Sequence, residues 1–419
     1  MTGCKPETVY PLNAVRAVAL ATQQLTSPSD PSSTSTIKDI EQLVAKIGCV
    51  QIDTLQVVHR SHYLVLWSRL GPYQPIDFDR LIYSPQSRHL FEAWQHAASI
   101  IPISQYRFQI PGQRRQREQP HEWYMNWLAK DDNRTILDTV MERIRTSGAV
   151  RARDFEYNGP KRGSWWDWKP VKVALEYLFA CGKLMIADRI NFQRVYDLTE
   201  RVLPSWVNKT EPSVEERDLF WIEQAVKALG VCQPAQAAEY AYMKRGRARA
   251  YVDQLIKQGV FRPIKARLID DQVYEMIVHH QNLDMLEMAA DGEIRPERTT
   301  FLSPFDNLFW ARDRDVQFWG FRNVLEAYKP SGSRIWGYFC LAILHNDRLV
   351  GRFDPKLERH NGTMRLKSLY LEPGIELDDI LLGSIAAAMH SFLKFHKAEQ
   401  VEIEQSQPVE FGDKLIAYL

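Results

Sequence analysis

The pattern of hydrophobic and polar positions divides the chain into helices, short strands and hairpins. Apolar residues recur at every third or fourth position over residues 11–25, 37–47 and 59–69, and this spacing predicts three helices. Residues 26–36 are mostly Ser, Thr and Pro, a composition that cannot bury a core and predicts a flexible loop insertion. The chain therefore opens with a helical part that contains one polar loop.

A short strand is predicted between the second and third of these helices. Val50 and Ile52 alternate there with Gln51 and Asp53, and a period of two is typical of a strand. Residues two apart on a strand point to the same face. The sequence therefore predicts that Gln51 and Asp53 project side by side while Ile52 points into a core.

An order of three helices followed by a β-hairpin occurs twice, over residues 133–198 and 214–277. The first hairpin is expected to turn at Asp188 and Arg189, and the second around residues 269–272. This is the order of a winged helix, a helix-turn-helix with a β wing. The N-terminal helices and strand fit a third copy with a modified wing, so the sequence predicts an array of winged helices.

The last part of the chain, residues 299–419, is rich in aromatic residues and turn formers. Four strands and one helix are predicted there, over residues 336–344, 348–354, 364–371, 401–403 and 377–395. This pattern fits an α+β domain or a small barrel with one helix. The fold class is therefore predicted as α+β, with tandem winged-helix motifs and a β-rich C-terminal domain. The expected division is a first winged-helix unit with the Gln51-Ile52-Asp53 motif (1–130), a second unit (131–210), a third unit (211–298) and the C-terminal domain (299–419).

Composition restricts the class of protein. The chain has 419 residues, a net charge of +1, 45% hydrophobic residues and 25% charged residues, so any basic surface must come from local clustering. Its five cysteines are scattered and form no CxxC pair, which indicates reduced thiols in a cytosol. No apolar run could span a bilayer, and the N-terminus lacks the apolar core of a signal peptide. We therefore expect a cytoplasmic protein without membrane contact.

One basic cluster stands out from this nearly neutral background. Residues 244–267 contain eight Lys and Arg residues and a single acid, Asp253. In the winged-helix interpretation they lie on a recognition helix and its wing, where they would meet DNA phosphates. The alternative is an ordinary solvated helix face.

The Gln51–Asp53 pair carries the candidate chemistry. A carboxylate and an amide on one stiff element could grip a single water molecule, with the carboxylate accepting its proton and the amide orienting its oxygen. The alternative is that both are solvated residues on an exposed strand. A metal hydrolase is not indicated, because the eleven histidines form no HExxH motif. We expect neither a metal nor a cofactor.

Five separated stretches resemble, in order, the motifs of a known family. They are Gln51-Ile-Asp-Thr and residues 62–70, 91–99, 303–310 and 336–356. Together they resemble the bacterial winged-helix DNA glycosylases of the YcaQ and AlkZ type over nearly the whole chain. The resemblance implies a C-shaped tandem of winged helices and the excision of alkylated purines with unhooking of DNA interstrand crosslinks. Gln51-Ile52-Asp53 matches the Gln-apolar-Asp pattern of the YcaQ branch.

The resemblance also suggests roles for individual residues. Asp53 would be the general base and the electrostatic partner of an oxocarbenium-like sugar, and Gln51 would position the water. By position, we expect an open groove to be lined by His62, Trp67, Arg69, Trp94 and His96. Candidate phosphate contacts are Arg153, Lys161, Arg162, Lys169, Lys244, Arg245, Arg247 and Arg249. The expected partner is double-stranded DNA with alkylated bases or crosslinks, bound by a monomer at the nucleoid.

Two other classes of function fit part of the pattern. A transcriptional regulator would also have winged helices and basic recognition helices, but it would need no carboxylate beside an amide, and it would bind a defined sequence, commonly as a dimer. An architectural or partner-binding protein would leave Gln51 and Asp53 as plain surface residues. Replacing Asp53 distinguishes these two classes from an enzyme, because only an enzyme would lose its activity.

Overall fold

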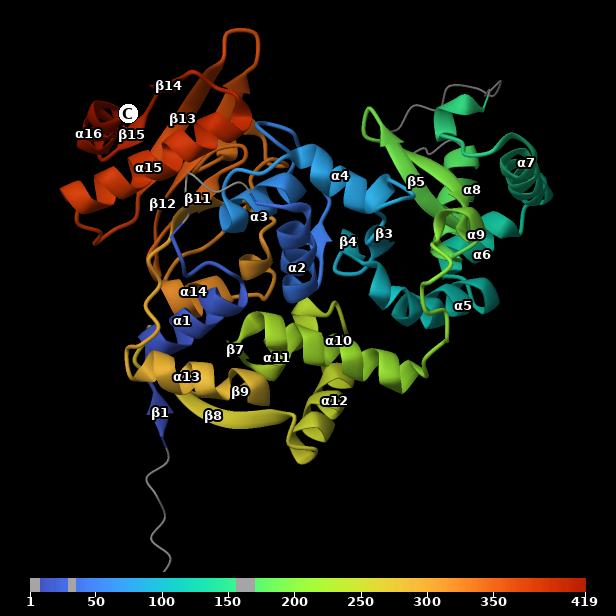
Figure 1. Ribbon diagram of the computed structural model, residues 1–419, viewed down its shortest axis with the longest axis horizontal. Coiled ribbons are helices and arrows are strands. Elements are labelled where there is room, and N and C mark those ends of the chain that lie inside the picture. Colours follow the sequence, from blue (N-terminus) through green and yellow to red (C-terminus); the bar gives the residue numbers. More distant parts are fainter. Residues whose placement is uncertain (1–7, 29–34, 156–169) are drawn as a thin grey trace, which may run out of the picture. The chain divides into compact units, whose positions relative to one another are not determined.

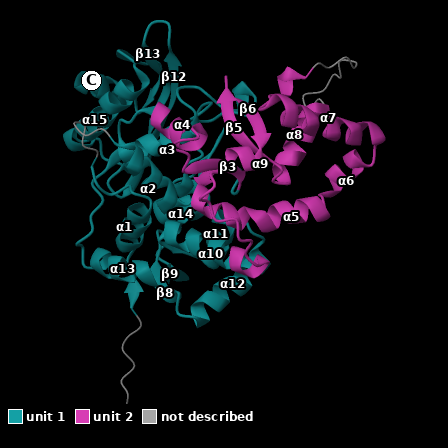
Figure 2. Ribbon diagram, turned by 45° about the vertical axis from the view of Figure 1, so that its right-hand side comes forward, with its two compact units in different colours: residues 1–75, 95–98, 218–419 teal, residues 76–94, 99–217 magenta. Residues whose placement is uncertain are grey.

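The computed structural model describes residues 8–28, 35–155 and 170–419 (Figure 1). Two compact units are present, and both are discontinuous in sequence (Figure 2). Unit 1 contains residues 1–75, 95–98 and 218–419, and unit 2 contains residues 76–94 and 99–217. No helix among the described residues is long and apolar enough to cross a membrane.

Unit 1 contains both ends of the described chain. Its helices are α1 (Leu12–Thr22), α2 (Ile37–Ile47), α3 (Ser61–Leu70), most of α10 (Val214–Leu229), α11 (Pro234–Tyr240), α12 (Arg245–Lys257), α13 (Leu283–Ala290), α14 (Arg314–Trp319), α15 (Asp379–His396) and α16 (Val409–Tyr418). Its strands are β1 (Val9–Tyr10), β2 (Val50–Gln51), β7 (Val231–Cys232), β8 (Phe261–Arg267), β9 (Val273–His279), β10 (Thr299–Leu302), β11 (Leu341–His345), β12 (Arg348–Glu358), β13 (Thr363–Leu371), β14 (Gln400–Ile403) and β15 (Ser406–Gln407).

Unit 2 is mostly helical. Its helices are α4 (Pro75–Tyr83), α5 (Ile110–Glu118), α6 (Glu122–Leu128), α7 (Asp131–Ser147), α8 (Pro170–Ala180) and α9 (Thr199–Val202). Its strands are β3 (Leu90–Trp94), β4 (Ala98–Pro102, with Ala98 counted in unit 1), β5 (Leu184–Ile190) and β6 (Gln193–Leu198). Short 3₁₀ helices occur in both units, at Ile103–Gln109, Ala152–Asp154, His280–Asn282, Asn307–Phe309 and Ser331–Ser333.

Two winged helices confirm the predicted order of helices followed by a hairpin. In one, α10, α11 and α12 precede the β8–β9 hairpin, and β7 adds to the hairpin beside β9. In the other, α7 and α8 precede the β5–β6 hairpin, and Val150 pairs with Tyr196 of β6 in the same way. The helix expected to open at Arg151 is only the 3₁₀ turn Ala152–Asp154 within the described residues.

The N-terminal elements follow the same order. After α2 and β2, the chain forms α3, α4 and the β3–β4 hairpin. The Ile52 N–H donates to the Ala98 carbonyl at 2.7 Å, so the start of β4 lies beside the end of β2, as β9 lies beside β7 in the third repeat. The Gln51-Ile52-Asp53 motif therefore begins at the last residue of the first strand of this repeat.

The first predicted hairpin turn was wrong by three residues. Asp188 and Arg189 belong to β5, and the turn consists of Asn191 and Phe192, which lie between the paired residues Ile190 and Gln193. Both turn residues have positive φ, 50° and 65°, as a type I′ turn requires. Asn tolerates this conformation well, and Arg189 is needed in the strand, where its guanidinium binds Glu92 of β3 at 2.5 Å.

The C-terminal part contains a mixed sheet with helices. It is therefore the predicted α+β domain and not the small barrel that was the alternative. The strand order is β10-β11-β12-β13-β14, and β15 also pairs with β13. Phe392 of α15 contacts Phe301 and Phe353 edge to face, so α15 packs on this sheet. The segment 336–340, expected as strand, is not part of β11. The Asp354 carboxylate accepts the Tyr338 and Phe339 N–H groups at 2.6 and 2.9 Å, so a side chain replaces the strand ladder there.

One hydrophobic core in unit 1 joins helix α1 to the first strands of the C-terminal sheet. Buried residues of α1 pack with residues of β8, β9, α13 and the C-terminal sheet. Strand β1 also pairs in parallel with β8. Three of the four parts expected from sequence therefore contribute to a single core.

Candidate active site

The Gln51–Asp53 motif lies where β2 ends and an irregular loop begins. Helix α2 ends at Gly48, whose φ of 84° suits glycine, and β2 includes only Val50 and Gln51. Ile52 is 8% exposed, whereas Gln51 and Asp53 are half-buried. The predicted alternation is therefore present in the burial of the three side chains, although the strand is shorter than expected.

The Asp53 carboxylate is held in a defined position. The Leu55 N–H donates to Asp53 Oδ1 at 2.7 Å, and Arg60 Nη1 donates to the Thr54 carbonyl at 2.5 Å. Burial raises the pKa of the Asp53 carboxyl, while the Leu55 N–H and the Arg60 charge oppose that rise. The loop thus presents a carboxylate that is partly desolvated but kept near a positive charge.

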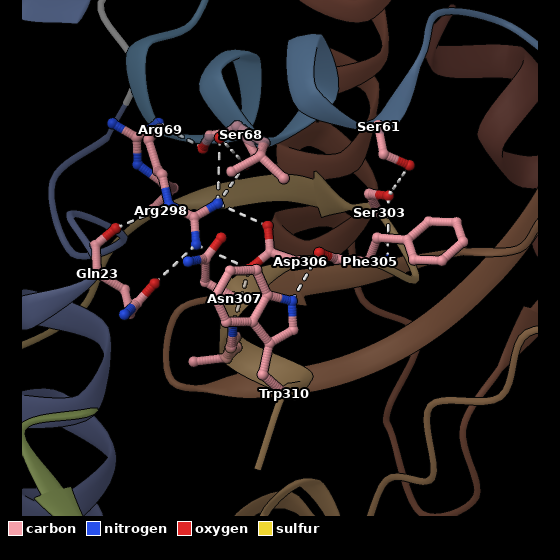
Figure 3. A network of polar contacts seen from close by, with 12 residues as sticks. Gln23, Ser61, Ser68, Arg69, Arg298, Ser303, Phe305, Asp306, Asn307 and Trp310 are labelled. Carbon is pink, nitrogen blue, oxygen red and sulfur yellow. Dashed lines mark hydrogen bonds and ion pairs between the residues drawn. The ribbon is translucent and has the colours of Figure 1, made fainter. Parts of the chain in front are cut away.

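Both ends of this loop are supported by residues 303–307 of unit 1 (Figure 3). Asn307 Nδ2 donates to the Cys49 carbonyl at 2.8 Å and to the Tyr240 hydroxyl at 3.0 Å. Ser303 Oγ donates to Ser61 Oγ, at the start of α3, at 2.9 Å. Because Cys49 and Ser61 bracket the motif, the 303–307 segment fixes where the loop begins and ends.

The prediction that Arg69 lines a DNA groove was wrong. Its guanidinium forms two hydrogen bonds with the Asp306 carboxylate, at 2.6 and 2.7 Å, and both side chains have no exposed surface. Arg69 also donates to the Gln23 carbonyl at 3.0 Å (Figure 3). It therefore ties α3 to the 303–307 segment and to the end of α1, and DNA cannot reach it.

His62 and Trp67 were also wrongly expected to line the groove. They are 4% and 3% exposed, and Trp67 packs edge to face on Phe392 with ring centroids 4.9 Å apart. Helix α3 is buried on most of its surface, which explains why its polar residues follow no single stripe. Both side chains belong to the packing of unit 1.

Trp94 and His96 remain accessible. Trp94 of β3 is 53% exposed, and the Arg194 guanidinium lies 5.5 Å from its ring centroid. His96 is half-buried and stacks on Trp310 at 4.1 Å with an angle of 4° between the rings. Burial lowers the pKa of His96, although hydrogen bonds to the backbone at Tyr240 and Glu239 oppose the effect. The roles of Trp94 and His96 in DNA binding stay predictions.

The predicted basic surface is partly neutralised. Lys244, Arg245, Arg247 and Arg249 are exposed at the start of α12. The three arginines are paired with Glu239, Asp218 and Asp253, respectively. Glu239 and Asp218 lie outside residues 244–267, so counting charges in that window overestimated the excess of positive charge. Arg153 is exposed as well, whereas Lys161, Arg162 and Lys169 lie outside the described residues.

Several residues close to the loop carry no signal in the sequence pattern. Leu357 donates its N–H to the Val57 carbonyl at 3.4 Å, and the Arg359 guanidinium donates to the Val58 carbonyl. Burial and, to a lesser degree, the Asp53 carboxylate raise the pKa of the Tyr328 phenol. They come from positions about 270 to 300 residues further along the chain, which no local period could have found. Among the described residues, no cluster of His, Cys, Asp and Glu could hold a metal ion.

Comparison with known proteins identifies the family. The model of the family described as DNA glycosylase AlkZ-like matches residues 44–395, most of the chain. The chain belongs to the AlkZ-like DNA glycosylase family. The matched range includes Gln51, Asp53 and the supporting 303–307 segment. The family therefore makes DNA the partner of this AlkZ-like protein.

A solved structure of the family's namesake shares the fold. The DNA glycosylase AlkZ of Streptomyces sahachiroi matches with a TM-score of 0.62 over 95% of this chain and 100% of that chain. The sequence identity is 12%. The likeness therefore shows the common fold of tandem winged helices and a β-rich C-terminal domain.

Proposed function

We propose that this AlkZ-like protein hydrolyses the N-glycosidic bond of N7-alkylated purines in duplex DNA and unhooks interstrand crosslinks joined through such bases. The observation that carries the proposal is the half-buried Asp53 carboxylate, which accepts the Leu55 N–H and lies two residues after Gln51 in the chain. Such a group, in a chain of a DNA glycosylase family, fits a water-activating base. Double-stranded DNA is the partner, bound by one copy of the chain.

An N7-alkylated purine suits a site with a single carboxylate. The base already carries a positive charge, so it leaves with the electron pair of the N-glycosidic bond without prior protonation. The sugar then develops oxocarbenium character, which a negative carboxylate stabilises. As the water oxygen bonds to C1′, Asp53 accepts one of its protons and Gln51 orients the oxygen.

Asp53 is suited to this role by its surroundings. Burial removes part of its hydration and raises its pKa, which makes it a stronger base than a fully solvated aspartate. The Leu55 N–H and the Arg60 charge limit that rise because both favour the charged carboxylate. No metal takes part in this scheme, so EDTA should leave the rate of base release unchanged.

The test is single-turnover release of free base from a duplex with one N7-methylguanine. Asp53→Asn keeps the shape of the side chain but removes the base, so we expect at least about a 100-fold lower rate with unchanged affinity for the duplex. Asp284→Asn, which changes an exposed carboxylate at the start of α13, is the matched control and should behave as wild type.

A crosslinked duplex joined through N7 of guanine is the second substrate. Wild type should separate its strands and Asp53→Asn should not. If wild type binds DNA but releases no base from either substrate, the proposal fails. Binding to one defined sequence would then favour a transcriptional regulator.

A further inference from the structure

Unit 2 contains a pocket that the Asp53 loop does not line. Its walls come from β3, the 3₁₀ helix Ile103–Gln109, α5, α8 and β5, all of which belong to unit 2 (Figure 2). The volume of the pocket is about 210 Å³. An apolar cavity of about 150 Å³ holds benzene, and drug-sized ligands use about 300 Å³ or more. The pocket therefore has room for one small ring system.

Aromatic side chains form a large part of the lining. Phe91 and Trp94 of β3, Tyr106 and Phe179 all line the pocket. The ring centroids of Phe91 and Tyr106 are 5.6 Å apart. The Arg194 guanidinium lies 5.5 Å from the ring centroid of Trp94 and 5.3 Å from that of Phe179, so one cation holds both rings. A lining of this kind suits a ligand that stacks on aromatic rings.

Three amides line the pocket from one helical face. Gln109, Gln113 and Gln116 lie four and three residues apart where the 3₁₀ helix continues into α5, a spacing that places them on the same side. A Cβ at Gly182 would come within 2.3 Å of the Gln113 side-chain oxygen, so the glycine makes room for this amide. An amide offers a donor and an acceptor together and can pair with the edge of a base.

The pocket holds no uncompensated charge. Among the lining residues that the structure describes, Glu92 alone is ionisable as an acid or a strong base. Its carboxylate accepts two hydrogen bonds from Arg189, at 2.5 and 2.7 Å, and one from the Tyr83 hydroxyl at 2.7 Å. Neither a phosphate nor an ammonium group would find an unpaired partner of opposite charge there. The lining therefore favours an uncharged ligand.

We propose that this cavity, which we call the nucleobase pocket, binds one uncharged purine or pyrimidine ring, either as a free base or as an unpaired base of DNA. The rings would stack on the base and the amides would bind its edge. DNA is the partner of this family, so bases of this class are at hand. The inference is independent of the proposed function, because Asp53 does not line the pocket and binding breaks no bond.

The first test compares two duplexes that differ by one unpaired adenine. Their affinities for the full chain are measured by fluorescence anisotropy of an end label. Stacking of one base on aromatic side chains predicts that wild type binds the bulged duplex about 5- to 150-fold more tightly than the paired duplex. This affinity ratio is the readout for each variant.

A glycine allows the pocket to be filled without disturbing its walls. Gly112 lines the pocket, and a Cβ placed there meets no atom of the described chain within 4 Å. Gly112→Leu should therefore occupy the cavity, lower the affinity ratio to about 1 and keep the melting temperature. Gly246→Leu is the matched control, because Gly246 on α12 of unit 1 has equally open surroundings. It should keep the wild-type ratio.

Trp94 provides a second variant that spares the core. Its side chain is 53% exposed, so its replacement should not unfold unit 2. Trp94→Ala should lower the affinity ratio, and Trp94→Phe should keep most of it, because a ring makes the contact. A Phe variant as defective as the Ala variant would contradict stacking on this ring.

Free 2-aminopurine, a base whose fluorescence is quenched by stacking, distinguishes the two sources of the ligand. Quenching by wild type that Gly112→Leu abolishes would show that a free base enters the pocket. Discrimination between the duplexes without such quenching would show that the base must be carried by DNA. Either result supports the nucleobase pocket. Absence of both in wild type, or an affinity ratio that Gly112→Leu leaves unchanged, would overturn the inference.

Discussion

The surroundings of Asp53 determine the pKa of its carboxyl and could not be predicted from the sequence. Its type and its spacing from Gln51 are visible in the sequence, but its half-buried state and its contact with Leu55 are not. Burial raises the pKa of its carboxyl, and a general base acts only when deprotonated. This direction of shift leads to a prediction about pH.

The rate of base release should decrease as pH falls through a pKa above the usual Asp value of 3.8. The measurement is a pH profile of single-turnover release from N7-methylguanine DNA. The raised pKa also means that the charged carboxylate costs stability, which is regained as pH falls and the group is protonated. Asp53→Asn should therefore be more stable than wild type at neutral pH, and this advantage should vanish at low pH. A pH-independent rate would contradict the assignment of Asp53 as base.

Arg69 shows the limit of assigning a role by position. The sequence shows an arginine 16 residues after Asp53. Only the structure shows that Arg69 forms an ion pair with Asp306 and that both side chains are fully buried. Removing one partner of a buried ion pair leaves an uncompensated charge, so Arg69→Ala should lower the free energy of unfolding by about 3–5 kcal/mol. Thermal or denaturant unfolding measures this loss.

The same variant should bind DNA normally at temperatures where it is folded. Arg80→Ala serves as the comparison, because Arg80 pairs with Asp77 but its side chain is 57% exposed, and it should change stability by about 0.5 kcal/mol or less. Weak DNA binding by a fully stable Arg69→Ala protein would instead restore the original expectation of a DNA contact.

Among the elements, those with strong local signals were predicted well. Helix α2 has the predicted bounds, and the structure supplies the reason, because the Thr36 side chain and the Asp39 carboxylate form a capping box at its start. The turn between β5 and β6 was misplaced, because Asp188 and Arg189 are polar but belong to the strand. Local polarity cannot tell a turn from a strand residue that binds a distant partner.

The sequence allowed the 303–307 segment to be recognised as a motif. It did not show that this segment supports the loop that contains Asp53. Asn307 holds the carbonyl of Cys49, two residues before Gln51. We predict that Asn307→Ala lowers the single-turnover rate at least about tenfold by loosening the loop and lowers stability by about 1–3 kcal/mol. Activity measured where the variant is fully folded separates the two effects.

A matched amide helps to interpret that result. Asn282 Nδ2 donates to the Lys227 carbonyl at 3.3 Å, remote in sequence from the motif. Asn282→Ala should lose some stability but keep the rate of base release. If both variants lose activity in proportion to stability, the 303–307 segment supports the fold generally and does not position the loop.

For the whole molecule, sequence predicted the winged-helix repeats but not how they share cores. The division into four parts followed local patterns, whereas the compact units mix residues 1–75 with residues 218–419. Pairing of β1 with β8 and the common core of α1 and the C-terminal sheet depend on contacts between distant residues. A hydrophobic period indicates which face of an element is buried but not which element covers it.

The electrostatic surface also has to be judged for the folded molecule. Net charge is +1, and the arginines at the start of α12 have acidic partners. If Arg249 contacts a phosphate, Arg249→Ala should weaken binding to all duplexes and reduce the slope of log affinity against log salt by about 1. Titrations at several salt concentrations measure this slope, and an unchanged slope would show that Arg249 stays with Asp253.

The support of the Asp53 loop by residues 303–307 and 357–359 has a consequence during protein synthesis. The ribosome makes the motif early, but its supports emerge only after about 250 to 300 further residues, or roughly 15 to 60 s at ordinary elongation rates. Until then the nascent chain contains Gln51 and Asp53 without the groups that position their loop. If the proposed function holds, a chain whose translation stops before residue 303 should release no base from damaged DNA, so that activity appears only when most of the polypeptide has been made.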